Sequence, residues 1–214
     1  MKMLCLLVAL FLVGCATPTA QLSNVSQVAD DKAIGRFYVG PFLDMRKGGD
    51  TDTTILGTKR GGYGNPLGRV RDERGADEFV REHLINAARA SFCFAERKPD
   101  NIMARKQDGK WVVEIGKDVN DKRPILVGVI GQLLVETGYS RATEVNIDLD
   151  LIDSDTGKTL WTSKLINRET GGMGGGIFEK VDKLKDWLAK TLQDEALKKF
   201  ASPEFQNAVK LNKQ

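Results

Sequence analysis

The chain has 214 residues, a length that suits one domain with short flanking segments. Its formal net charge is only +3, so it lacks the strongly basic balance of a nucleic-acid-binding protein, and no nucleic-acid partner is expected. A single histidine, His83, and three cysteines offer few ligands for zinc, so no metal site is predicted.

The first fifteen residues are organised like a secretory signal. A positive start precedes an apolar run over residues 3–13, which is too short to span a membrane because spanning takes about 20 residues. The ending Leu12-Val13-Gly14-Cys15 resembles the lipobox of bacterial lipoproteins, in which the cysteine receives a diacylglycerol and then an N-acyl chain. We therefore expect cleavage between Gly14 and Cys15, a covalent lipid on Cys15 and no other cofactor.

Lipidation of Cys15 predicts the location of the protein. Two or more acyl chains hold a protein stably on a membrane, so the membrane is an expected partner through the anchor. The next residue is Ala16, and lipoproteins kept in the inner membrane often have aspartate there. This resemblance favours the periplasmic face of the outer membrane, with the inner membrane as the alternative. Cys93 remains as a lone thiol, and its apolar neighbours predict that it is buried and inert.

The first half of the mature chain is predicted to contain a polar tether, a strand, a glycine-rich loop and a helix. Residues 15–32 are polar and predict a flexible, lipidated tether, and a single domain is expected over residues 33–202. The β-forming residues Ile34 to Phe42 predict the first strand. Residues 47–75 contain many glycines and predict mostly loop, with short extended pieces. Apolar residues at helical spacing then predict a helix that begins near Ala76.

The second half carries the strongest structural signals. Strict alternation over Val145–Leu151, the turn Asp153–Lys158 and the strand Leu160–Ile166 predict an antiparallel hairpin. Within the charged insert 97–123, the apolar piece at Trp111 could be one arm of another hairpin. A long strand precedes the first hairpin, and we expect one apolar face to be formed by Ile125, Val127, Val129, Leu133 and Val135.

The last segments predict a hinge, a helix and a tail. Glycines over residues 171–176 match no phosphate-binding motif and are expected to form a hinge. Ile177–Phe200 has the periodicity of an amphipathic helix, and residues 203–214 are predicted to form a helical or disordered tail. The predicted fold class is therefore α+β: a mixed or antiparallel sheet of about four to five strands with two main helices packed on it.

The order of these elements resembles the YajG-type bacterial envelope lipoproteins, whose fold is similar to the TolB amino-terminal, LpoB and CsgG domains. Asp44-Met45-Arg46 is similar to an aspartate-x-arginine after the family's first strand, and Gly57 with Tyr63-Gly64 is similar to its glycine-marked loop. The resemblance covers roughly residues 33–200, and the hairpin Val145–Trp161 is its most specific part. It implies an accessory protein that binds other envelope proteins or assembles into larger structures.

The resemblance to these lipoproteins and the glycine-rich loop over residues 47–75 lead to a functional hypothesis. A binding module that contacts another envelope protein is the leading interpretation, and a self-assembling ring or pore subunit, hence a homo-oligomer, is the alternative. No catalytic residue is assigned, because His83 has no expected acid or base beside it. An enzyme would become the better interpretation only if the fold brought His83 close to Asp44 and Arg46. The candidate partner-binding residues are Asp44, Arg46, Gly57, Tyr63 and Gly64.

Overall fold

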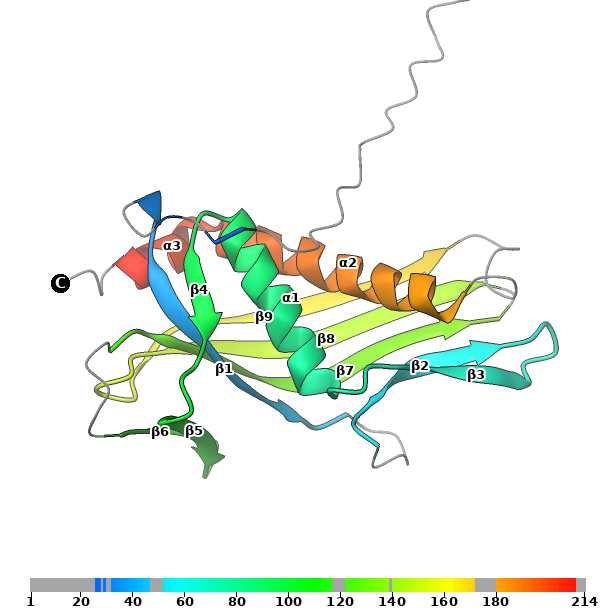
Figure 1. The fold of residues 1–214 in the computed structure, drawn as a ribbon, viewed down its shortest axis with the longest axis horizontal. Helices are drawn as coiled ribbons and strands as arrows, with labels where there is room; N and C mark the ends of the chain where they lie inside the picture. The colour runs from blue at the N-terminus through cyan, green and yellow to red at the C-terminus, as the bar shows by residue number, and fades with distance from the viewer. Residues whose placement is uncertain are drawn as a thin grey trace, which may run out of the picture.

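The computed structural model describes residues 26–27, 29, 32–46, 52–116, 122–138, 140–171 and 180–210 (Figure 1). The predicted signal segment, the lipidation site Cys15 and most of the expected tether lie outside the described residues, as does nearly all of the predicted hinge. Among the residues described, no helix combines the length and apolar character that crossing a membrane requires.

The predicted α+β class is confirmed. A mixed sheet of seven strands carries the fold, which exceeds the predicted four to five because the glycine-rich region contributes two strands. The strands are β1 (Arg36–Asp44), β2 (Ile55–Arg60), β3 (Pro66–Arg71), β4 (Phe94–Arg97), β7 (Ile125–Thr137), β8 (Arg141–Ile152) and β9 (Thr159–Gly171).

The long strand β7 organises the sheet. One of its edges pairs antiparallel with β8 along its whole length, and β8 pairs in turn with β9, as the predicted hairpin requires. Its other edge is shared by two parallel strands, because β1 pairs with Ile125–Ile130 and β2 with Val135–Thr137. The strands β1 and β2 therefore lie end to end along β7, and β3 pairs only with the outer side of β2.

The predicted facing of β7 is wrong in its first half. The register of β7 against β8 shifts between Ile130 and Gln132, so Gly131 sits in a β-bulge that reverses the alternation of side chains. Leu126 and Ile130, not Val127, share the helix-covered core with the later residues Leu133 and Val135. The first-half residues Ile125, Val127 and Val129 belong instead to a smaller cluster on the opposite face.

Two helices cover one face of the sheet. The helices α1 (Ala76–Ala90) and α2 (Val181–Phe200) lie side by side there (Figure 1). On α2, Leu184, Leu188 and Leu192 are buried, and Val181 packs partly buried against the same core. Amphipathic spacing explains why both helices were recognisable, because a buried stripe repeats every three to four residues.

The predicted tail contains a packed helix. Helix α3 (Pro203–Lys210) inserts the fully buried Phe205 between the rings of Phe37 and Phe200, with centroids 5.4 and 4.8 Å away. Trp161 of β9 contacts the same phenylalanine edge-on. Residues 203–210 therefore belong to the hydrophobic core rather than to a tail, and such an aromatic cluster stabilises the domain beyond the area it buries.

A second hairpin covers part of the opposite face. The strands β5 (Ile102–Gln107) and β6 (Lys110–Ile115) form their own two-stranded sheet from the charged insert, with Trp111 in an arm as expected (Figure 1). The indole Nε1 of Trp111 donates a hydrogen bond of 2.9 Å to Asp150 of β8. This contact and the buried Ile102 fix the hairpin on the sheet, so both faces of β7 carry apolar cover.

Candidate functional site

The β2–β3 hairpin is the part of the glycine-rich region that reaches beyond the main sheet. Only Gly57–Lys59 of β2 pair with β7, so the hairpin extends past the end of that strand (Figure 1). Its tip, defined as residues 61–65, holds Tyr63 with 99% of its surface exposed. On the β3 arm, Leu67 is 53% exposed. The hairpin thus presents two large apolar side chains to solvent at one end of the molecule.

The tip has a defined turn geometry. The Gly61 N–H donates to the carbonyl of Asn65, and the Gly64 N–H donates to the carbonyl of Gly61, both at 2.8–2.9 Å. Gly64 has a φ of +78°, a conformation that side-chain-bearing residues rarely adopt. Hydrogen bonding and glycine chemistry therefore shape a compact turn that leaves the ring of Tyr63 outside it.

Basic side chains flank the exposed tip. Lys59 and Arg60 precede it on β2, and Arg69 and Arg71 follow it on β3. Arg60 lies 3.6 Å from Glu136, and Arg71 lies 2.7 Å from Asp52, but both arginines remain about 40% exposed. The hairpin therefore combines apolar contact area with positive charge, which suits an apolar pocket bordered by acidic groups on a partner protein.

The base of the hairpin is fixed by Arg46. Its guanidinium pairs with both carboxylate oxygens of Asp44 at 2.7 and 2.8 Å. It also donates to the backbone carbonyls of Ile55, Thr53 and Leu133, at 2.6, 3.1 and 3.4 Å. These carbonyls lie where β1 has ended and β2 begins along β7, so Arg46 occupies the junction and supplies donors that strand pairing does not supply there.

Burial agrees with a structural role for this pair. The side chains of Asp44 and Arg46 are only 15% and 16% exposed, and a bidentate arginine–carboxylate pair is among the stronger polar interactions in proteins. The sequence alone placed both residues among the candidate partner-binding residues. The structure places them inside the domain, with their polar atoms directed to its own backbone.

Gly57 is also engaged within the domain. A Cβ atom at this position would lie 1.9 Å from the carbonyl oxygen of Val135, far inside van der Waals contact. The absence of a side chain lets β2 approach β7 closely enough to pair with Val135. Of the five candidate residues, only Tyr63 and Gly64 therefore lie on the exposed tip.

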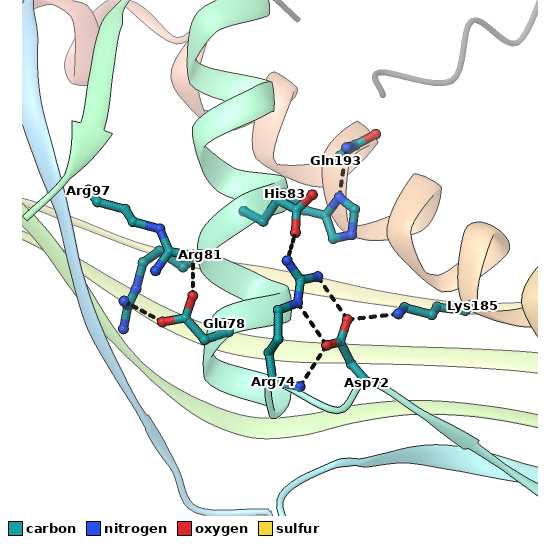
Figure 2. A network of polar contacts seen from close by, with 9 residues as sticks. Asp72, Arg74, Glu78, Arg81, His83, Arg97, Lys185 and Gln193 are labelled. Carbon is teal, nitrogen blue, oxygen red and sulfur yellow. Dashed lines mark hydrogen bonds and ion pairs between the residues drawn. The ribbon is translucent and has the colours of Figure 1, made fainter. Parts of the chain in front are cut away.

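An ion-pair network joins the other arm of the hairpin base to the helices. Asp72 directly follows β3, is 2% exposed, and contacts both Arg74 and Lys185 of α2 at 3.0 and 2.8 Å (Figure 2). Burial acts to raise the pKa of Asp72, but hydrogen bonds from Arg74 and Lys185 outweigh it and hold the pKa well below its usual range. The carboxylate thus stays ionised and connects β3 to α2.

His83 lies in a packed, polar setting between the helices. Its Nδ1 is 2.8 Å from the side-chain amide of Gln193 on α2 (Figure 2). Its ring packs edge-on against that of Phe79. Burial lowers the pKa of His83 to about 4, so the imidazole is neutral at pH 7. In the part of the chain that the structure describes, no hydrogen bond or ion pair joins His83 to Asp44 or Arg46, and no metal-binding cluster forms.

The remaining thiol is protected. Cys93 is fully buried, and burial raises its pKa to about 12, which disfavours the reactive thiolate at neutral pH. The hairpin residues that sequence reasoning missed are Leu67 and the four basic residues of its arms. The alternation of basic residues with glycine and apolar residues around Tyr63 was the available signal, but the abundance of glycine favoured a loop.

Comparisons with known proteins support the fold but assign no family. No protein-family model and no curated protein matches the chain. Protein XCC0632 from Xanthomonas campestris, described under the family model DUF330, has a similar structure, with a TM-score of 0.51 at 7% identity over 86% of this chain and 94% of that chain. At that identity the likeness shows a shared fold and nothing about activity.

Two further solved structures are more distant. The PelC dodecamer from Paraburkholderia phytofirmans reaches a TM-score of 0.39 at 14% identity, covering 80% of this chain and 93% of that chain. An uncharacterized protein reaches 0.43 at 10% identity, covering 82% and 94%. Both scores are too low to support an argument about this chain.

Proposed function

We propose that this chain is a lipid-anchored accessory protein of the bacterial envelope, of the YajG type, which binds another envelope protein through its β2–β3 hairpin. The sequence Leu12-Val13-Gly14-Cys15 supports the anchor, with lipid on Cys15 and the domain on the periplasmic face of the outer membrane. The observation that carries the binding proposal is the 99% exposure of Tyr63 at the tip of a projecting hairpin.

Exposure of this tyrosine has a cost that binding would recover. Aromatic side chains bury a large area and dominate the energetics of many protein interfaces, where tyrosine is enriched. Tyr63 leaves that area in water, whereas the aromatic residues of the core pack against one another. Leu67 would enlarge the apolar contact, and the surrounding arginines would interact with an acidic rim.

The base of the hairpin prepares the tip for binding. Arg46 and the close approach at Gly57 hold β2 against β7, so the arms are ordered before any partner arrives. A preformed binding element loses less conformational entropy on association than a disordered one. The candidate residues therefore have two different roles. Asp44, Arg46 and Gly57 position the hairpin, and Tyr63 contacts the partner.

Such a role requires no covalent chemistry. We propose that the protein is not an enzyme and carries no cofactor beyond the acyl groups on Cys15. The protein would act by holding its binding hairpin at one membrane, because a lipid anchor confines the hairpin there and raises the frequency of encounters with other envelope proteins.

Co-purification tests the binding proposal. Full-length, lipidated protein is purified from its own cells as the wild type, as Tyr63→Ala and as Lys110→Ala, a control at the exposed start of β6 in the other hairpin. We expect a discrete envelope protein to co-purify with the wild type and with Lys110→Ala, and to be lost with Tyr63→Ala. Equal recovery with all three would contradict the proposed site. Recovery of this chain alone, in multiple copies, would favour the self-assembly alternative.

Membrane fractionation tests the anchor separately. Cys15→Ser should move the protein from the membrane fraction to the soluble fraction, because the acyl chains would no longer be attached. Palmitate labelling of the wild type but not of the variant gives a second readout. Continued membrane association of an unlabelled Cys15→Ser protein would overturn the anchor proposal while leaving the hairpin proposal open to its own test.

A further inference from the structure

A groove of about 520 Å³ lies along α1. Ser26 and Gln27 line part of it, and the rest is formed by residues of α1 and β4 together with Arg74, which precedes α1. This volume falls in the range of small-ligand sites, about 300–1,000 Å³. The groove is distinct from the β2–β3 tip, and its lining includes residues that neither the sequence motifs nor the hairpin account for.

Two amide side chains line the groove, and that of Gln27 is buried without hydrogen-bond partners. Both polar atoms of the Gln27 side chain are buried with no partner. Asn86 of α1 is 6% exposed as a residue and lines the same groove, but among the described residues its amide is not one of the fully buried groups without a partner. A buried polar group without a partner costs about 1–3 kcal/mol, so such groups in a folded protein call for an explanation. A bound polar ligand would satisfy the amide of Gln27, and the amide of Asn86 lines the same groove.

The charges of the groove leave one cation unbalanced. Arg74 pairs with Asp72 and Glu82, and Arg97 pairs with Glu78 (Figure 2). Glu96 pairs with Arg123, which lies outside the groove lining. Arg89 differs from these residues because, within the described ranges, its side chain has no acidic partner.

Arg89 keeps its terminal guanidinium nitrogens available. Its Nε donates to the carbonyl of Ala95 at 3.3 Å, and within the described ranges no ion pair involves its side chain. The Nε contact holds the guanidinium beside β4. The end of the fork therefore offers two parallel N–H donors, a geometry that matches the two oxygens of a carboxylate.

We propose that this groove binds the carboxyl end of a short peptide. Arg89 would pair with the terminal carboxylate, and the side chains of Gln27 and Asn86 would pair with the adjoining peptide group. An amide side chain offers both a donor and an acceptor, which are the complements of a peptide carbonyl and N–H. The site needs no feature of the β2–β3 hairpin, so it stands or falls separately from the proposed function.

Calorimetric titration of the full-length, detergent-solubilised protein tests the site. The probe is N-acetyl-Ala-Ala with a free carboxylate, and its carboxamide serves as the matched control ligand. We expect saturable binding of the acid and at least about tenfold weaker binding of the amide, because the bidentate ion pair is lost. Equal binding of both ligands, or no saturable heat at millimolar peptide, would overturn the proposal and assign the two amides to water.

Variants place the binding in the groove. Arg89→Gln should weaken binding of the acid at least about tenfold, and Arg89→Lys should recover part of it because lysine keeps the charge but not the fork. Arg168→Gln, on the exposed surface of β9, should bind like the wild type. Thermal unfolding of each variant shows whether the fold is intact. Unchanged affinity in a folded Arg89→Gln protein would exclude this groove as the site.

Discussion

The base of the β2–β3 hairpin is held by buried polar contacts, whereas its tip has Tyr63 almost fully in solvent. At the base, Arg46 makes five side-chain hydrogen bonds, and Asp72 is 2% exposed between two cations. At the tip, the turn hydrogen bonds join tip residues to one another. One glycine-rich region therefore contains both a structural part and an exposed part. Mutations in the two parts should have different effects on stability.

The largest expected effect is a steric one at the base. Gly57→Val should destabilise the domain by about 3 kcal/mol, because its side chain would collide with the backbone of Val135. Gly68→Val is the matched control, since nothing lies within 4 Å of a Cβ added at Gly68. Urea unfolding of both variants measures the difference. If both lost the same stability, the close approach of β2 to β7 would not be what requires Gly57.

Removal of the junction arginine should have the next largest effect. Arg46→Ala should cost about 2 kcal/mol, because it leaves the partly buried Asp44 and the backbone carbonyls at the junction without their donor. Arg105→Ala, which removes a well-exposed arginine paired with Glu114, should cost less than about 0.5 kcal/mol. Chemical denaturation compares the two. A cost for Arg46→Ala as small as that of the control would contradict its structural role.

The buried carboxylate at the base should make stability depend on pH. The pKa of Asp72 is lowered in the folded state, so its stabilising contribution is fully present above the unfolded value of about 3.9 and is lost as pH falls below it. Asp72→Asn should therefore be less stable than the wild type by about 1–2 kcal/mol at pH 7. That gap should narrow below pH 4. A gap that stays constant down to pH 2 would show that the charge of Asp72 is not the cause.

The smallest effect on stability belongs to the tip. Tyr63→Ala should change the free energy of unfolding by less than about 0.5 kcal/mol, because a side chain that is 99% exposed loses no packing. A thermal or urea unfolding curve that overlays the wild type would agree. A clear loss of stability would mean that Tyr63 packs against the domain in solution, and the contrast between base and tip would then fail.

Local periodicity made much of the fold predictable. The stripe of α2 and the alternation of β8 follow from spacing within each element, so they were visible without any partner. The facing of β7 was not, because the bulge at Gly131 changes which residues point to the helices and appears only when β7 is paired with β8. The packing of helix α3 into the core was missed for a similar reason, since Phe205 is buried by residues distant in sequence.

The sequence predicted which segment forms the candidate site, but it did not predict what each residue of that segment does. Arg46 and Tyr63 both fit the family-like pattern, and only the fold shows that the first is held by backbone carbonyls while the second is exposed. The groove on α1 gave no sequence signal. Gln27, Asn86 and Arg89 are ordinary surface residue types, and they are distant in sequence, so only the fold brings them into one groove.

The most direct test of the central claim is site-specific photo-cross-linking in living cells. A photo-reactive amino acid is placed at position 63 in place of Tyr63 and, in a second strain, at position 110 in place of Lys110. We predict that position 63 of the lipidated protein captures one discrete envelope protein, identified by mass spectrometry, and that position 110 does not. Capture of the same protein from position 110 but not from position 63 would contradict the account.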